Sequence, residues 1–319
     1  YKIFIDEGHF QNITNVTFSP NGNLLASASL DKTIKIWDIK TKTTLRTLEG
    51  HTKIISSISF SSDNKYLLSS SFDGSIRLWN LENGEIEKKF DSDNEEFTAA
   101  CISPNGKMIA TANFNNKIKL WDLNIGIVLR TIETHKDRIL SLFFTPDGKY
   151  LISGSKDKNI KIWSVIDGNL AIKIENKFPI NFLIISPDGQ FLAASYEDKS
   201  IAVYEVKSGN LIKKIVGQKN QILSLAFSKD GKTLAGSDAN GSIYLWNILD
   251  GTLISEFQGH SGAILSLSIS NENYLASGGK DRIIKLWDLN NKNLISTLGE
   301  NVIGANFIEY SPNFEYLTT

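Results

Sequence analysis

The chain has 319 residues and a formal net charge of −1, from 34 basic and 35 acidic side chains. This balance gives no global field that would attract a polyanion or an acidic membrane surface, so it favours neither nucleic acid nor membrane as a partner. No apolar run approaches the roughly 20 residues of a membrane-spanning helix. The lone Cys101 lies in an apolar segment, so we expect a buried thiol and a reducing compartment.

The first predicted elements are short strands joined by tight turns. Segment 2–5 is predicted to be an outer strand, because later segments that precede a Gly-His pair have the same apolar character. A strand is expected through 16–18, followed by a Ser-Pro-Asn-Gly turn at 19–22. Strands at 24–28 and 33–37 should follow, with a short turn at Asp31 between them.

This unit recurs along the whole chain. The aromatic residues that end the third strand are spaced 41 or 42 residues apart and include all six tryptophans: Trp37, Trp79, Trp121, Trp163, Tyr204, Trp246 and Trp287. The apolar residues before the Ser-Pro-Asn-Gly-like turn repeat with the same spacing. Both faces of each third strand are largely apolar, so small sheets must stack against their neighbours to bury them.

A period of this length, with Gly-His early and Trp-Asp late, resembles the WD40 family of β-propellers over nearly all of the chain. The resemblance implies an all-β fold, a β-propeller of four-stranded antiparallel blades. We expect seven complete WD40 blades in residues 1–298, including the leading outer strand, and the start of an eighth repeat in 299–319. The start of this eighth repeat leaves an eight-bladed ring or part of a longer tandem array as the alternative. Seven blades are favoured, because segment 299–319 stops before its own Trp-bearing strand.

The resemblance also implies a buried tetrad in several blades, formed by a His, a Ser, an Asp and the Trp. A carboxylate that orients a neutral imidazole, whose other nitrogen meets a hydroxyl, satisfies every polar group without catalysis. The four predicted tetrads use all four histidines: His9, Ser27, Asp31 and Trp37; His51, Ser69, Asp73 and Trp79; His135, Ser153, Asp157 and Trp163; His260, Ser277, Asp281 and Trp287.

Three blades depart from this pattern, and their internal networks are expected to be weaker. The residues in the corresponding places are Asp93, Thr111 and Asn115 in blade 3, Asn176, Ala194, Asp198 and Tyr204 in blade 5, and Gln218, Gly236 and Asn240 in blade 6.

Searches for nucleotide-binding, zinc-protease and hydrolase motifs find none, and no histidine is left over for a metal site. The sequence therefore predicts no catalytic residue, no cofactor and no metal.

The wide face, where the first strands begin, is the usual binding face of the family that the chain resembles. Residues before the tetrad Asp, and those three and five after the tetrad His, should look outward there. Apolar residues gather at these positions in blades 1 to 3, which indicates an interaction surface. The predicted partner-binding residues are Leu30, Ile54, Phe72, Phe114, Arg138, Leu140, Leu223 and Leu265.

The resemblance thus implies a non-enzymatic, monomeric scaffold or sensor domain that binds a peptide or loop of another protein on its wide face. We expect it to be part of a larger signalling or assembly protein, in a cytoplasmic or otherwise intracellular location. The alternative is a ligand-binding or enzymatic propeller with its site in the central channel. A nucleic-acid-binding surface would need a basic stripe that the balanced charge does not supply.

Overall fold

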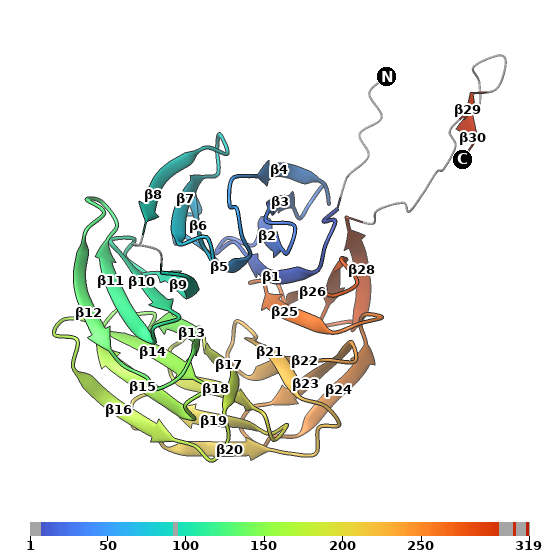
Figure 1. Cartoon of the computed structure of the whole chain (residues 1–319). Helices are drawn as coiled ribbons and strands as arrows, with labels where there is room; N and C mark the ends of the chain where they lie inside the picture. The colour runs from blue at the N-terminus through green and yellow to red at the C-terminus, as the bar shows by residue number, and fades with distance from the viewer. Residues whose placement is uncertain (1–7, 92–94, 300–308, 311–316, 319) are drawn as a thin grey trace.

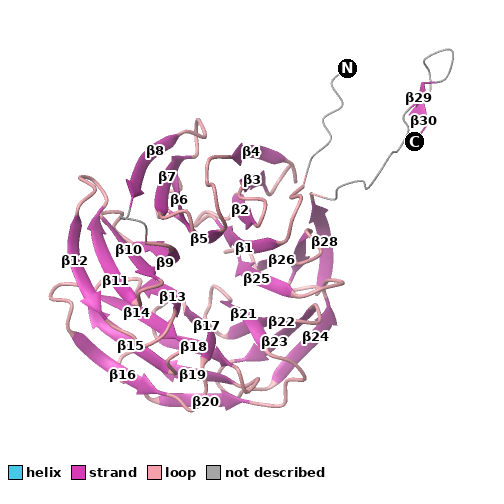
Figure 2. Ribbon diagram, in the orientation of Figure 1, coloured by secondary structure: helices cyan, strands magenta, loops and turns pink. Residues whose placement is uncertain are grey.

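The computed structural model describes residues 8–91, 95–299, 309–310 and 317–318. Seven four-stranded sheets are arranged as blades around a central opening, with the first strand of each blade innermost and the fourth outermost (Figures 1 and 2). Every sheet is antiparallel and follows chain order, so each blade is a meander. This confirms the predicted all-β propeller of seven complete blades.

The strands have the following bounds. Blade 1 contains β1 (Ile13–Phe18), β2 (Leu24–Ser29), β3 (Ile34–Asp38) and β4 (Thr44–Leu48). Blade 2 contains β5 (Ile55–Phe60), β6 (Tyr66–Ser71), β7 (Ser75–Asn80) and β8 (Ile86–Asp91). Blade 3 contains β9 (Phe97–Ile102), β10 (Met108–Asn113), β11 (Lys117–Asp122) and β12 (Val128–Glu133). Blade 4 contains β13 (Ile139–Phe144), β14 (Tyr150–Ser155), β15 (Asn159–Ser164) and β16 (Leu170–Glu175).

Blade 5 contains β17 (Ile180–Ile185), β18 (Phe191–Tyr196), β19 (Ile201–Glu205) and β20 (Leu211–Ile215). Blade 6 contains β21 (Ile222–Phe227), β22 (Thr233–Asp238), β23 (Ser242–Asn247) and β24 (Leu253–Gln258). Blade 7 contains β25 (Ile264–Ile269), β26 (Tyr274–Gly279), β27 (Ile284–Asp288) and β28 (Asn293–Leu298). Beyond the blades, β29 (Glu309–Tyr310) pairs with β30 (Leu317–Thr318). No helix in the described parts of the chain is long and apolar enough to cross a membrane.

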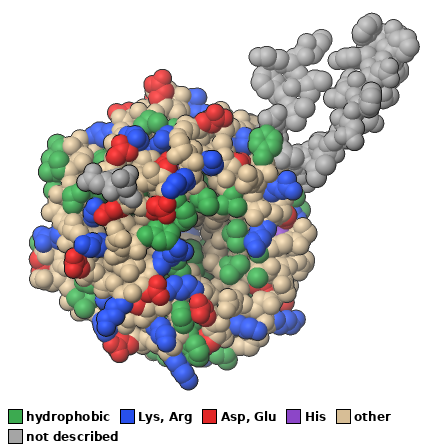
Figure 3. Space-filling view, in the orientation of Figure 1, with side chains coloured by type: hydrophobic (Ala, Val, Ile, Leu, Met, Phe, Trp, Pro, Cys, Tyr) green, Lys and Arg blue, Asp and Glu red, His purple; other side chains and the backbone are tan. Residues whose placement is uncertain are grey.

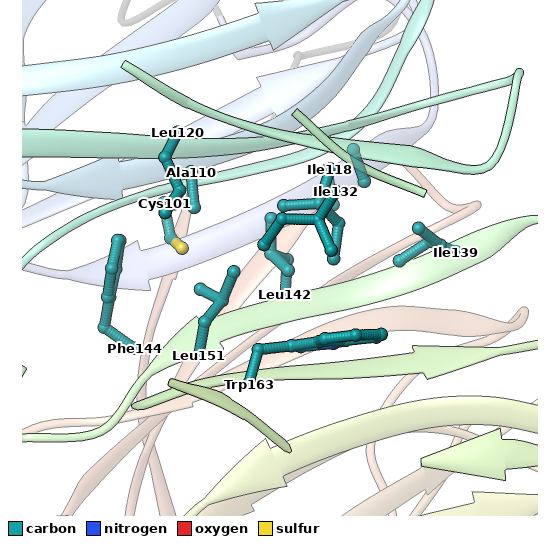
Figure 4. Close-up of a cluster of buried hydrophobic side chains, with 12 residues drawn as sticks. Cys101, Ala110, Ile118, Leu120, Ile132, Ile139, Leu142, Phe144, Leu151 and Trp163 are labelled. Atoms are coloured by element: carbon teal, nitrogen blue, oxygen red, sulfur yellow. The ribbon is translucent and has the colours of Figure 1, made fainter. Parts of the chain in front are cut away.

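The hydrophobic core lies between blades rather than within them. One cluster joins Cys101 and Leu120 of blade 3 to Leu142, Leu151 and Trp163 of blade 4 (Figure 4). Six further clusters of buried apolar residues lie in the other parts of the ring. Both faces of the small sheets are covered in this way, as the apolar third strands predict.

The ring closes between the first and last blades. The backbone amides of Val16 and Phe18 in β1 donate to the hydroxyl oxygens of Ser266 and Ser268 in β25, each over 3.0 Å. Apolar residues of blades 1 and 7 share one buried cluster. The predicted outer strand at 2–5 and most of the predicted eighth repeat at 299–319 lie outside the described residues, so those boundaries remain predictions.

Candidate functional site

Four blades contain the same hydrogen-bonded network behind the wide face. In blade 1, His9 Nδ1 lies 2.9 Å from Asp31 Oδ2, and His9 Nε2 lies 2.7 Å from Ser27 Oγ. Trp37 Nε1 donates to the same Ser27 oxygen over 2.9 Å. Thr33 donates its hydroxyl and its amide to the other Asp31 oxygen. If His9 Nδ1 carries a proton and donates it to Asp31, and the Ser27 hydroxyl donates to His9 Nε2, every polar group of this network has a partner.

The equivalent residues of blades 2, 4 and 7 repeat these contacts. The His–Asp distances are 2.8 or 2.9 Å and the His–Ser distances are 2.7 or 2.8 Å, while each Trp donates to its Ser over 2.8 to 3.0 Å. These sets are His51, Asp73, Ser69 and Trp79; His135, Asp157, Ser153 and Trp163; and His260, Asp281, Ser277 and Trp287. All four imidazoles are 0 or 1% exposed.

The pKa values of the tetrad carboxyl groups are lowered in the folded chain. Burial raises the pKa of Asp157, but hydrogen bonds from His135 and from the Lys136 amide outweigh burial and hold that pKa well below its usual range. Asp31, Asp73 and Asp281 have lowered pKa values for the same reason, each with its own histidine as donor. Burial lowers the pKa of His135 despite the neighbouring carboxylate. The network therefore stabilises a carboxylate facing a neutral imidazole.

We expect the free energy of unfolding to fall as the pH drops below about 6.5, because the pKa of His135 is lowered in the folded chain, and to fall further below about 4, where the tetrad carboxyl groups contribute. The folded pKa of Asp157 lies below its unfolded value, so between the two the unfolded chain binds more protons and acid favours unfolding. Urea unfolding at a series of pH values from about 7 to 3 measures this slope. Asp157→Asn, which cannot titrate, should give a shallower slope; an unchanged slope would contradict this assignment.

Blade 3 keeps one contact at the tetrad-equivalent positions and has a second polar network beside it. Trp121 Nε1 still donates to Thr111 Oγ1 over 2.9 Å. However, Glu95 Oε2 accepts from Asn113 Nδ2 at 2.8 Å and from Lys119 Nζ at 2.6 Å. Burial opposes ionisation of Glu95, but these donors lower its pKa.

Blade 6 contains a network at the same positions. The side chain of Asp238 is fully buried, and its Oδ2 accepts from Asn220 Nδ2 at 2.9 Å and from Tyr244 OH at 3.1 Å. Its Oδ1 accepts from the amides of Asn240 and Ser242, each at 2.9 Å. Burial raises the pKa of Tyr244 to about 12.

The polar networks of blades 3 and 6 are therefore displaced by two residues from the tetrad-equivalent positions, although Thr111 keeps the place of the tetrad Ser. In both blades three residues form the network. The first (Glu95 or Asn220) lies two residues after the tetrad His position. The second (Asn113 or Asp238) lies two residues before the tetrad Asp position, and the third (Lys119 or Tyr244) lies two residues before the Trp. Asp93 lies outside the described residues, and the Oε1 of Gln218 is buried without a hydrogen-bond partner. Gly236 replaces the tetrad Ser because a Cβ there would lie 2.6 Å from the ring of Trp246. In both blades the first and second network residues are 18 residues apart in the sequence, and the second and third are 6 apart. This shared spacing was the signal that could have located both networks.

Blade 5 keeps Asn176 in the place predicted for it. The Asn176 side-chain oxygen accepts from Tyr204 OH at 2.7 Å and from Tyr196 OH at 3.0 Å. The two phenol oxygens are 2.9 Å apart, and burial raises the pKa of both tyrosines. Asp198 instead accepts from Ser200.

A β-bulge marks the start of every inner strand. In β13 the register passes from Ile139 to Ser141, so Leu140 has no partner in β14. A bulge re-aims its side chain and ends regular pairing. The bulge residues of blades 1 to 7 are Thr14, Ser56, Thr98, Leu140, Asn181, Leu223 and Leu265.

Three of the predicted partner-binding residues form one continuous stack across blades 2, 3 and 4. The ring of Phe72 meets the ring of Phe114 edge to face, with centroids 5.2 Å apart at 76°. The guanidinium carbon of Arg138 lies 4.2 Å above the Phe114 centroid. Both rings are partly exposed and Arg138 is exposed. We call these three residues the aromatic stack.

Backbone hydrogen bonds fix the positions of the three stack residues. The amides of Phe72 and Phe114 donate to the carbonyls of Ile54 and Glu96, at 2.9 and 3.1 Å, and the Lys156 amide donates to the carbonyl of Arg138. Lys53 pairs with Glu96 at 2.8 Å beside it. Such edge-to-face and cation–π contacts each contribute roughly 0.5–1.5 kcal/mol at partly exposed sites.

The other predicted residues are distributed around the ring. Ile54, next to Phe72 through its backbone bond, is 36% exposed. Leu30 is partly exposed on blade 1, while Leu223 and Leu265 are bulge residues of blades 6 and 7. Leu140 lines the central channel. The stack is therefore the predicted subset for which the structure shows side-chain to side-chain contact.

The central channel contains a cavity of about 340 Å³, and Figure 3 shows its opening with hydrophobic and charged side chains on the rim. Its lining among the described residues contains hydroxyl and apolar side chains but no acidic, basic or imidazole group. Cys101 lines it too, and burial raises the pKa of this thiol to about 12. No group of three or more metal-ligating side chains occurs in the described ranges. This lining does not favour the channel-centred alternative.

The comparisons with known proteins agree with this architecture. A family model described as the IFT122 first β-propeller matches residues 96–319, and the WD domain, G-beta repeat model matches residues 2–38 and 42–80. A WD40 repeat-containing protein of Dictyostelium discoideum is 46% identical over 43 residues, which are 14% of this chain and 6% of that protein. WD40 propellers are in general protein-interaction scaffolds. The chain belongs to the WD40-repeat β-propeller family that the IFT122 first-propeller model describes.

Proposed function

We propose that this propeller is a non-enzymatic scaffold module that binds a short peptide or loop of a partner protein at the aromatic stack. The observation that carries the proposal is the continuous contact from Phe72 through Phe114 to Arg138 across three blades. A rigid aromatic base with a neighbouring guanidinium provides apolar anchoring and a hydrogen-bonding group for a peptide backbone or carboxylate. Ile54 and Leu30 extend the apolar surface, and Glu96 gives it polarity.

The tetrads support a non-enzymatic role. Each imidazole is enclosed, and both of its nitrogens already have partners, so none can take a proton from a substrate. Their function in this proposal is to fix the turn that follows a wide-face residue, as the tetrad residue Asp73 does directly after Phe72. The match to a first propeller supports placing the domain within a larger assembly protein, in an intracellular location.

The double variant Phe72→Ala with Phe114→Ala should weaken partner binding well over tenfold, because truncation of buried aromatic anchors typically costs about 2 kcal/mol or more each. Partners are recovered from native lysate on wild-type and variant propellers in parallel. The proteins lost with the variant are then titrated individually against both. The thermal midpoint of the variant should change less than that of Trp163→Ala.

Phe10→Ala is the matched control, because this ring is 62% exposed and lies on blade 1 outside the stack. Lys156→Ala tests the rim, since Lys156 already pairs with Glu197 at 2.6 Å. Both single variants should bind as the wild type does. Equal affinity of the double variant and the wild type would remove the aromatic stack as the binding site.

A further inference from the structure

Basic side chains join neighbouring blades at three seams. Arg46 in β4 reaches the turn after β7 in blade 2, where its Nε donates to the Leu81 carbonyl at 3.2 Å and its guanidinium also donates to the Glu82 carbonyl. Lys88 Nζ in β8 donates to the Leu123 carbonyl of blade 3 at 3.0 Å. These contacts occur far from the wide face, because the turns follow the third strands. We call the position that Arg46 and Lys88 occupy in their outer strands the latch position.

The same contact recurs one period later. Arg130 in β12 donates to the Ile166 carbonyl of blade 4 at 3.1 Å. Its stem lies over Gly168, where a Cβ would be 2.4 Å from Arg130 Cδ, and this glycine has a φ of +75°. At the latch position the aliphatic stem of the basic side chain therefore packs over a glycine of the next blade, and its cationic end donates to backbone carbonyls there.

Blade 4 lacks the basic residue. Its latch position holds Ile172, which lies over Gly209 in the same way: a Cβ on that glycine would be 2.8 Å from Ile172 Cγ2. The carbonyls of Val206 and Lys207 occupy the places of those that the other latches cap. Among the hydrogen bonds of the described residues, no side chain donates to either carbonyl.

A cavity of about 490 Å³ lies at this seam. Its apolar wall includes Ile162, Ile172 and the 40% exposed ring of Tyr150. Asp147 and Asp188 contribute carboxylates, and hydrogen bonds from Thr145 and Lys149 lower the pKa of Asp147. Two carboxylates and one cation, Lys207, line the cavity, and Asp147 also lies 3.8 Å from Lys149 Nζ. No ion pair among the described residues involves Asp188, so the lining is complementary to a positive group there.

We propose that this seam between blades 4 and 5 binds an arginine side chain presented by an extended segment of a partner protein. The guanidinium takes the place of the missing latch and donates to the carbonyls of Val206 and Lys207, while Asp147 or Asp188 balances its charge. The stem packs on Ile172 and Tyr150. Arg46 and Arg130 show that this chain already holds guanidinium groups in such a seam.

The seam between blades 7 and 1 is a weaker fit for a cation. Its latch position holds Ser296, and it has a cavity of about 580 Å³. Lys40 and Lys42 line that cavity and balance its carboxylates from Asp38 and Glu272. The excess of carboxylates is found at the seam between blades 4 and 5.

The test is a titration of the whole chain, labelled at isoleucine methyl groups, with the capped peptide acetyl-Leu-Arg-Leu-amide. Saturable shifts of the Ile162 and Ile172 methyl signals, with a Kd of about 1 mM or tighter, are expected. The matched peptide acetyl-Leu-Gln-Leu-amide should bind at least about tenfold more weakly, because it lacks the cation.

Two variants locate the site. Ile172→Arg fills the groove with the chain's own latch, as in blade 3, and should abolish the shift at Ile162 and raise the thermal midpoint. Asp188→Asn, an exposed and conservative change, should weaken binding of the arginine peptide several-fold while the fold persists. Absence of saturable shifts up to about 10 mM, equal binding of the glutamine peptide, or undiminished binding by Ile172→Arg would each overturn the proposal.

Discussion

Trp163→Ala is expected to lower the free energy of unfolding by about 3 to 5 kcal/mol, the usual range for truncating a large buried aromatic residue. The indole is 5% exposed and lies between blades 3 and 4 (Figure 4). Its Nε1 donates to Ser153 Oγ at 3.0 Å, and Lys161 Nζ lies 5.5 Å from the ring centroid. The variant therefore loses packing at a seam and one hydrogen bond of a tetrad. Urea unfolding followed by circular dichroism measures the loss.

Two controls separate these contributions. Trp163→Phe keeps most of the ring volume but removes the hydrogen bond, so we expect an intermediate loss of about 1 to 2 kcal/mol. Ile166→Ala, at a side chain that is 85% exposed, should change stability by less than about 0.5 kcal/mol. If Trp163→Ala costs no more than Ile166→Ala, the seams are not where the stability of this ring resides.

The fold was predictable because it repeats. Each third strand is apolar on both faces, and a period of 41 or 42 residues fixes the number of seams. The hydrogen bonds that close the ring between blades 1 and 7 were not predictable. Ser266 and Val16 are 250 residues apart, and nothing in the local sequence of either strand identifies its partner. Only the ring geometry brings them together.

The candidate site was predictable in part. The family positions selected Phe72, Phe114 and Arg138, but not their mutual contact, which depends on the bulge and register of three separate sheets. They also selected Leu223 and Leu265, which lie in blades remote in sequence from the stack. Position in a repeat says which way a residue faces, whereas contact depends on which neighbours the ring places beside it.

The largest surprise in the polar interior was the network in blade 6. A search for replacements at the tetrad positions selected Gly236 and Asn240, whereas the buried acceptor is Asp238, two residues earlier than Asn240. Tyr244 and Trp246 stack there with centroids 5.4 Å apart. The hydroxyl of Tyr244 donates to Asp238, so this ring pair belongs to the displaced network.

Asp238→Ala is therefore expected to lower the free energy of unfolding by about 3 to 5 kcal/mol. It removes the acceptor for four donors at once, among them the buried phenol of Tyr244 and the half-buried side-chain amide of Asn220. Each stranded buried donor costs about 1 to 3 kcal/mol, and the total within one network is less than the sum of the separate costs. Asn240→Ala is the matched control: its exposed side chain should matter by less than about 0.5 kcal/mol, although it occupies the tetrad Asp position. Chemical unfolding of both variants at neutral pH distinguishes the two networks. A large loss in Asn240→Ala with little in Asp238→Ala would restore the tetrad positions as the polar centre of blade 6; the opposite order would establish the displaced network as a second way in which this repeat satisfies its interior.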